Sequence, residues 1–153
     1  MSFTQLHTRL LLSLSLVLTL GACRSASYQT VPSADLAAPV DGARVVLLRE
    51  GGIAWGRFPL VVYEGTTELA RLAPGRFFSW DRPAGRFVGR LVMERPQWEG
   101  GPVERVYDVQ LADGETHYIR VGIDLTSASP ETERLEREVA VEALAGADPV
   151  SVR

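Results

Sequence analysis

A regular succession of short β-prone runs and turn signals constrains the fold of this chain more than any other feature. The runs are rich in Val, Leu, Ile, Phe and Tyr, and Gly, Pro or an Asp-Gly pair interrupts them about every ten residues. The expected strands span residues 43–49, 60–64, 67–72, 76–80, 86–94, 106–111 and 116–124. Short strands at such even spacing favour a sandwich over a barrel or an α/β fold. The sequence therefore predicts an all-β domain, a small antiparallel β-sandwich of about seven strands.

The turns predict how several of these strands are connected. Residues 65–66 supply a turn, and the alternating run 67–72 then fits a half-buried hairpin partner. Residues 73–75 fit a type II turn, because Pro74 fixes φ and Gly75 accepts a positive φ.

The clearest expected hairpin lies later in the chain. Asp113 and Gly114 form a strong tight-turn pair between the strands 106–111 and 116–124. One face of the returning strand carries Ile119, Val121 and Ile123. We therefore expect these two strands to pair with each other.

The C-terminal stretch is ambiguous. Residues 129–131 have the cap, proline and acidic residue of a helix start. Strand-like alternation is nevertheless present in Leu135, Arg137, Val139 and Val141. We favour a final strand over 133–139 and a short helix over 140–145, with one helix from Ser129 to Gly146 as the alternative.

The N-terminal stretch predicts the cellular compartment. Arg9 precedes an apolar run over residues 10–20, which is the charged start and short apolar core of a secretory signal. The run ends in the tetrad Leu20, Gly21, Ala22 and Cys23, which resembles a bacterial lipobox. In that motif the first three residues are recognised by the signal peptidase and the cysteine thiol accepts the lipid. We therefore expect lipidation at Cys23.

This prediction divides the chain into four parts. Residues 1–22 are the expected lipoprotein signal peptide, and residues 23–43 are the acylated cysteine and a flexible tether rich in Ala, Ser and Pro. The β-sandwich domain follows over 44–146, and 147–153 form a tail. Arg24 stands where an aspartate would favour retention in the inner membrane, so we expect a lipid anchor in the outer membrane, facing the periplasm.

Composition narrows the possible partners. The formal net charge of −3 argues against nucleic acid as a partner. All 16 basic residues are arginine, which we interpret as a compositional habit. The single cysteine belongs to the lipobox, so no internal disulfide can form and stability must come from packing.

Several segments together resemble a known family. They are Val61–Gly65, Glu68–Leu72, Pro74–Phe78, Pro83–Gly85 and Gly114–Val121. This pattern is similar to a family of small bacterial lipoproteins that share domain of unknown function 2846, and the likeness covers residues 43–144. The resemblance implies a prealbumin-like β-sandwich, similar to the regulatory domains of carboxypeptidases. The family has no established activity, so the resemblance assigns no catalytic residues.

Few residues are candidates for catalysis. After signal removal the only histidine is His117, which we interpret as an ordinary strand residue near a turn. One histidine without a free thiol leaves only carboxylates as metal ligands, so we expect neither a metal site nor a cofactor. Glu64 and Glu68 across a hairpin, or Asp81 beside aromatic residues, are more typical of solvated charges than of a glycosidase pair.

Aromatic and basic side chains are candidates for surface recognition. Trp55 and Trp98 lie in expected loops, where an indole can stack on a glycan or anchor a protein partner. Trp80 follows Phe78 by two residues and therefore continues a core face. A possible basic edge consists of the arginines at 71, 76, 82, 86 and 90.

The sequence thus predicts a lipid-anchored periplasmic protein that acts as a non-catalytic binding or accessory module, with a protein of the cell envelope as its partner. Two alternatives stay open. One is a cell-wall glycan-binding module that uses Trp55 and Trp98, and the other is a weak hydrolase that depends on carboxylates or on His117.

Overall fold

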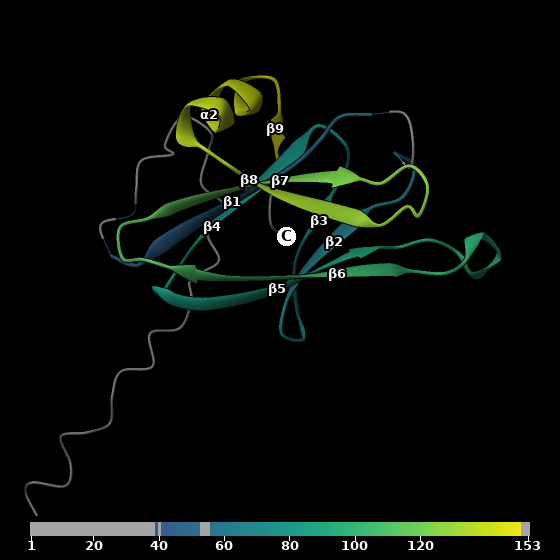
Figure 1. Cartoon of the computed structure of the whole chain (residues 1–153), viewed down its shortest axis with the longest axis horizontal. Coiled ribbons are helices and arrows are strands. Elements are labelled where there is room, and N and C mark those ends of the chain that lie inside the picture. The colour runs from purple at the N-terminus through teal and green to yellow at the C-terminus, as the bar shows by residue number, and fades with distance from the viewer. Residues whose placement is uncertain (1–38, 40, 53–55, 151–153) are drawn as a thin grey trace, which may run out of the picture.

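The computed structural model describes residues 39, 41–52 and 56–150. Among these residues, nine strands form two sheets that pack face to face (Figure 1). Their bounds are β1 (Ala43–Arg49), β2 (Leu60–Glu64), β3 (Thr67–Leu72), β4 (Arg76–Arg82), β5 (Gly85–Met93), β6 (Val103–Leu111), β7 (Thr116–Ile123), β8 (Pro130–Leu135) and β9 (Asp148–Pro149). The first sheet has the order β8-β7-β1-β4-β9, and the second has the order β3-β2-β5-β6. The predicted all-β sandwich is confirmed.

β1 is the central strand of the first sheet, and all seven of its residues are buried. Val45 and Leu47 face the second sheet, whereas Val46 and Leu48 belong to the apolar cluster on the opposite face. Because both faces are covered, the strand is a continuous apolar run instead of an alternating one. β1 pairs with β4 in antiparallel and with β7 in parallel orientation, so the sheet is not purely antiparallel.

Aromatic rings fill the space between the two sheets. Trp80 stacks on Phe78 with a centroid distance of 4.8 Å, and Phe87 meets Trp80 edge-on at 5.6 Å. Trp80 is fully buried, which confirms its predicted place in the core. Gly89 has a packing role in β5, because a Cβ atom there would lie 2.7 Å from the Phe87 ring.

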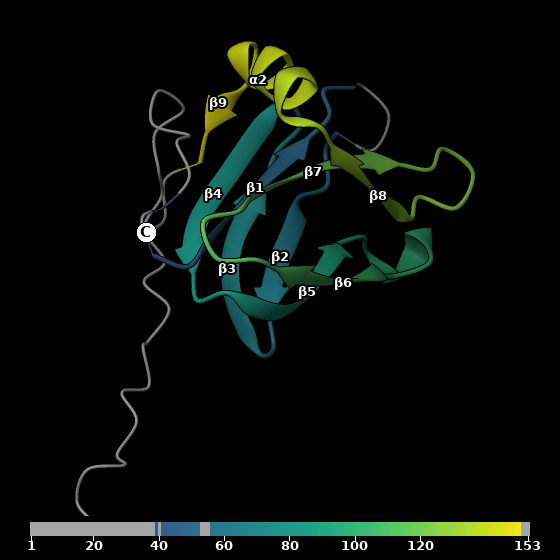
Figure 2. The ribbon, with the colours of Figure 1, turned by 60° about the vertical axis from the view of Figure 1, so that its left-hand side comes forward.

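The C-terminal segment covers the outer face of the first sheet (Figure 2). Helix α2 (Arg137–Ala145) buries Ala140 and Leu144, which are four residues apart on one helix face. A strand followed by a helix is confirmed, but the predicted boundary was wrong, since Val139 is already helical. The alternative helix start at residues 129–131 was also wrong, because Pro130 begins β8 and pairs with Ile123.

Two of the three turn predictions are confirmed. β2 and β3 form the expected hairpin around Gly65, which has a φ of 57°. Gly75 has the expected positive φ of 71°, and Arg76 N donates to Ala73 O at 3.2 Å across the turn. This second turn leads from the second sheet to the first.

The predicted hairpin at Asp113 and Gly114 was wrong. β6 pairs with β5, and β7 pairs with β1 and β8, so the turn passes from one sheet to the other. The turn is attached to the residue that precedes β1: Gly42 N donates to Asp113 Oδ1 and Gly114 N donates to Gly42 O, both at 2.7 Å. These bonds fix the corner where β1 enters the fold.

The strand directions divide the sandwich into two ends. At the entry end, residues 41–42 lead into β1, and the connections 83–84 and 112–115 lie beside them. The far end holds the connections 73–75, 94–102 and 124–129. The nine residues of β5 run from the entry end to the far end, a distance of about 30 Å at the usual rise per residue.

Candidate functional site

Trp98 is the most exposed large apolar side chain among the described residues, with 79% of its surface accessible. It lies at the far end, in the 3-10 turn η2 (Gln97–Glu99). Pro96 O accepts hydrogen bonds from the backbone N–H groups of Glu99 at 2.9 Å and Gly101 at 3.1 Å. Arg95 Nε donates to Gly101 O at 3.0 Å, which closes the loop from its other side. The indole therefore projects from a turn whose backbone is already hydrogen-bonded.

The other tryptophan predicted for recognition, Trp55, lies outside the described residues. A second exposed apolar side chain at the far end is Leu125, with 71% of its surface accessible. Its loop is held by Asp124, whose Oδ1 accepts from Thr126 N and Ser127 N, both at 2.7 Å. These bonds lower the pKa of the Asp124 carboxyl. The loop of Leu125, like that of Trp98, is thus held by local hydrogen bonds.

His117 lies on the inward face of β7 at the entry end and is only 1% exposed. Its Nδ1 is 3.2 Å from Glu115 Oε1, and its Nε2 is 2.5 Å from the Tyr107 hydroxyl. A carboxylate only accepts hydrogen bonds, so Nδ1 carries the proton and Nε2 accepts from the hydroxyl. Since Tyr107 is in β6 and His117 is in β7, the imidazole joins the two sheets.

The charge state of this group follows from its burial. Loss of hydration lowers the pKa of His117, and the hydrogen bond that its Nδ1 donates to Glu115 opposes this effect. A backbone hydrogen bond from Ala112 lowers the pKa of Glu115. Burial raises the pKa of the Tyr107 hydroxyl. At neutral pH the group therefore consists of a neutral phenol, a neutral imidazole and a carboxylate.

This arrangement is that of a structural histidine. Both ring nitrogens already have partners, and neither partner is a serine or cysteine nucleophile. The sequence singled out His117 but missed Tyr107 and Glu115. Glu115 could have been found from its position two residues before His117, because side chains two residues apart in extended backbone lie on the same side. Tyr107 could not, because its contact depends on how β6 and β7 are placed in different sheets.

The candidate carboxylates are separated into individual ion pairs. Each one holds its own arginine, as Glu64–Arg82 at 2.8 Å, Glu68–Arg71 at 2.8 Å and Asp81–Arg44 at 2.7 Å. A glycosidase needs two carboxyl groups that face one substrate. The contacts of Glu64 and Glu68 with different arginines do not provide that arrangement.

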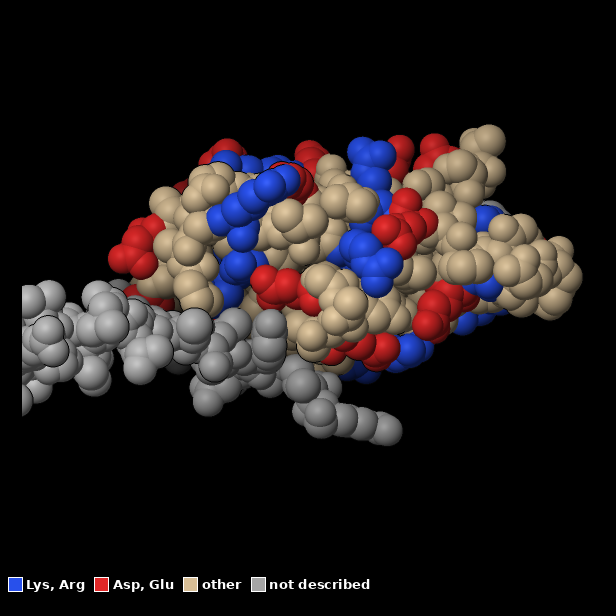
Figure 3. Space-filling model, turned by 90° about the horizontal axis from the view of Figure 1, so that it is seen from below, with Lys and Arg blue, Asp and Glu red and all other residues tan. Residues whose placement is uncertain are grey.

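The predicted basic edge is likewise neutralised. Besides Arg71 and Arg82, the other members form the pairs Arg76–Asp148 at 3.6 Å, Arg86–Asp108 at 2.6 Å and Arg90–Glu104 at 3.1 Å. Figure 3 shows the result, a face on which acidic and basic side chains alternate. Exposed pairs of this kind contribute little to stability. Their effect is to leave no continuous basic patch on this face.

Two further features concern metals and membranes. The described residues contain no group of three or more His, Cys, Asp or Glu side chains that could hold a metal ion. Within the same part of the chain, no helix is long and apolar enough to cross a membrane.

No family model matches the chain, and no curated protein matches it significantly.

Proposed function

We propose that this chain is a lipid-anchored envelope protein, held in the outer membrane through Cys23, whose far end binds a partner in the periplasm. In this proposal it is a non-catalytic binding or accessory module. The exposure of Trp98 on a hydrogen-bonded turn is the observation that carries the binding part. The lipobox Leu20–Cys23 carries the anchoring part.

The position of Trp98 supports a periplasmic partner. The chain enters the domain at the entry end, and β5 separates the two ends by about 30 Å. A tether of about 20 residues adds roughly 25 Å between the membrane and the entry end. The indole is thus presented away from the bilayer, toward other components of the envelope.

The turn around Trp98 also favours binding on energetic grounds. Ordering a loop at an interface reduces affinity, and a preformed loop avoids most of that cost. Tryptophan is one of the residues that contribute most to interfaces, because a large apolar ring is combined with one hydrogen-bond donor. A single exposed apolar residue is common on protein surfaces, so the structural basis of the proposal is the combination of exposure and a fixed turn.

The same indole supports the glycan-binding alternative. A flat aromatic ring stacks on the apolar face of a sugar, and Gln97 next to Trp98 offers an exposed amide for hydroxyl groups. The hydrolase alternative has less support. His117 is buried with both nitrogens hydrogen-bonded, and Glu64 and Glu68 bind separate arginines.

Substitution of the lipobox cysteine tests the anchor. The wild-type chain should lose residues 1–22, gain the mass of a lipid and fractionate with the outer membrane. Cys23→Ser should accumulate as the larger, unprocessed form. If Cys23→Ser matures and fractionates like the wild type, the chain is not a lipoprotein.

Co-sedimentation with purified cell-wall sacculi separates the two kinds of partner. Glycan binding predicts that the wild-type protein pellets and that Trp98→Ala does not. Val139→Ala is the matched control, because Val139 is 49% exposed on α2, a separate element from the Trp98 turn. If wild type, Trp98→Ala and Val139→Ala all stay in the supernatant, the glycan alternative is excluded and a protein partner is favoured.

A further inference from the structure

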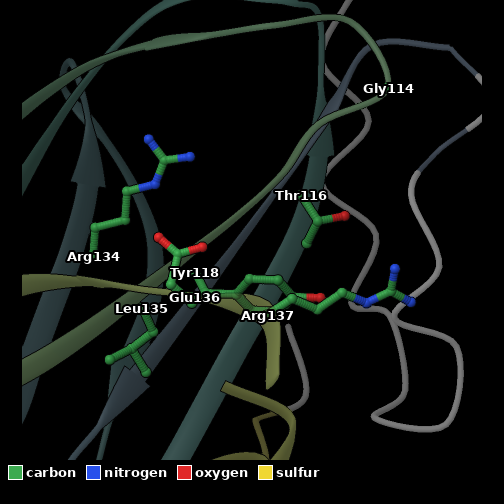
Figure 4. Close-up of a pocket in the computed structure, with 7 residues that line it drawn as sticks. All are labelled: Gly114, Thr116, Tyr118, Arg134, Leu135, Glu136 and Arg137. Carbon is green, nitrogen blue, oxygen red and sulfur yellow. The ribbon is translucent and has the colours of Figure 1, made fainter. Parts of the chain in front are cut away.

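A pocket lies at the entry end, where β7 begins and where the chain passes from β8 into α2. Its volume is about 220 Å³. The lining residues, drawn in Figure 4, are Gly114, Thr116, Tyr118, Arg134, Leu135, Glu136 and Arg137. Most of them present a hydroxyl, a guanidinium or a carboxylate, so the pocket is suited to a polar ligand.

Three hydrogen-bond donors in this pocket have no partner within the described part of the chain. The Thr116 hydroxyl is buried and makes no hydrogen bond there. The Tyr118 hydroxyl and the guanidinium of Arg137 make no hydrogen bond or ion pair with described residues either. A buried hydroxyl without a partner costs about 1 to 3 kcal/mol. A ligand that accepts hydrogen bonds would remove this cost.

The charges of the pocket are unevenly distributed. Figure 4 shows the Glu136 carboxylate on the side of Arg134, whereas the guanidinium of Arg137 lies on the side of Thr116. Arg134 also pairs with Glu115 at 3.2 Å, outside the lining residues. Among the residues that line the pocket, no carboxylate therefore lies on the side of Arg137.

The backbone adds to this positive character. Arg137 is the first residue of the nine-residue helix α2, and the side chain of the preceding Glu136 makes no capping hydrogen bond. The first N–H groups of a helix lack intrahelical acceptors and carry partial positive charge. Here they accompany an arginine and a buried threonine hydroxyl that have no partner among the described residues.

We propose that this pocket binds the phosphate group of a small ligand. Arginine matches phosphate with two parallel hydrogen bonds, and the hydroxyls of Thr116 and Tyr118 can donate to further phosphate oxygens. Drug-sized ligands occupy roughly 300–1,000 Å³, so a volume of about 220 Å³ fits a phosphate with a short substituent. This site is separate from the far end that the proposed function uses.

The location allows two sources for such a group. The pocket is at the end of the domain where residues 41–42 lead into β1. If the chain is anchored through Cys23, this end faces the bilayer, where phospholipid headgroups present phosphate. A soluble phosphate ester in the periplasm presents the same chemistry.

Titration with inorganic phosphate tests the proposal directly. The mature lipidated protein in neutral detergent micelles is titrated calorimetrically, with chloride at matched ionic strength as the blank. We expect saturable binding that Arg137→Gln weakens at least tenfold. Thr116→Val should weaken it as well, since this change removes the buried hydroxyl and keeps the shape of the side chain.

The control is Arg105→Gln. Arg105 is an exposed arginine of β6 with no ion pair among the described residues, and it lies at the opposite end of the domain. Its substitution removes the same charge and should leave phosphate affinity unchanged. Absence of saturable phosphate binding, or equal losses in Arg137→Gln and Arg105→Gln, would overturn the proposal.

Competition identifies the source of the phosphate. Micelles doped with phosphatidic acid should displace inorganic phosphate if the site takes a lipid headgroup. If glycerol 3-phosphate displaces it and the doped micelles do not, the ligand is a soluble phosphate ester. Both results support a phosphate site, and they differ only in the molecule that carries the group.

Discussion

The buried His117 predicts how the stability of the domain depends on pH. Its ordinary pKa is 6.5, and burial lowers the pKa in the folded state. Below pH 6.5 the unfolded chain therefore binds a proton that the folded chain does not. The free energy of unfolding is fully retained above pH 6.5 and decreases as the pH falls below that value, until the folded-state pKa is reached.

The size of the effect can be bounded. One proton difference changes the free energy of unfolding by at most about 1.4 kcal/mol per pH unit. Glu115 contributes in the same direction only below its ordinary pKa of 4.5, and Asp108 and Asp124 only below 3.8. Between pH 6.5 and 4.5 the imidazole thus acts alone among these groups, and its maximum contribution is about 2.7 kcal/mol.

Urea unfolding of the mature protein, followed by tryptophan fluorescence at several pH values between 7.5 and 4.5, measures this slope. We expect the wild type to lose stability below pH 6.5 and His117→Phe to show a much flatter profile. His117→Phe also removes the hydrogen bonds to Tyr107 and Glu115, so the slope and not the absolute stability is the informative quantity. A wild-type stability that is constant from pH 6.5 to 4.5, or equal slopes in both proteins, would refute the reasoning.

Four other substitutions test the packing, each by the same urea assay at pH 7.5. Arg49→Met should cost about 3 kcal/mol, because the buried guanidinium donates to two backbone carbonyls at 2.8 and 2.6 Å. Gly42→Ala should cost more than about 2 kcal/mol, since its φ is 86° and a Cβ would lie 2.4 Å from Arg82 O. Gly65→Ala, with a positive φ but open space around it, should cost only about 1 kcal/mol. Trp98→Ala should leave the midpoint unchanged, because the side chain is 79% exposed. Equal losses for the two glycines, or a large loss at Trp98, would contradict these assignments.

The strands of this fold were predictable because their signals are local. β1 could be recognised as a buried strand from seven residues, with no knowledge of what covers it. The strand and helix at the C-terminus were harder, because residues 133–141 fit both periods. Packing favours one period in each half of this segment. Leu135, the last residue of β8, and the helical residues Ala140 and Leu144 all pack in the same apolar cluster.

Strand pairing was not predictable to the same degree. Asp113 and Gly114 correctly indicated a reversal of the chain, but a turn signal does not say whether the next strand stays in the same sheet. The hydrogen bonds to Gly42 that fix this corner join residues about 70 positions apart. The contact of Tyr107 with His117 was not predictable either, because it depends on the placement of β6 and β7 in different sheets.

The candidate sites likewise differ in whether a local sequence signal could predict them. The exposure of Trp98 agrees with its expected loop, since a proline and two glycines flank it in the sequence. The pocket near Arg137 was not anticipated, because this residue was assigned to a strand. Its lining comes from the connection 112–115, from β7 and from the segment that joins the end of β8 to the start of α2, which only the tertiary fold brings together.

Photo-crosslinking in intact cells tests the central claim that the far end is a binding surface. A benzophenone side chain is introduced in place of Trp98 or, as a control, in place of Val139 on α2. We expect a reproducible envelope adduct from position 98, identified by mass spectrometry, and none from position 139. No adduct from position 98, or the same adducts from both positions, would contradict the proposed binding role of the far end.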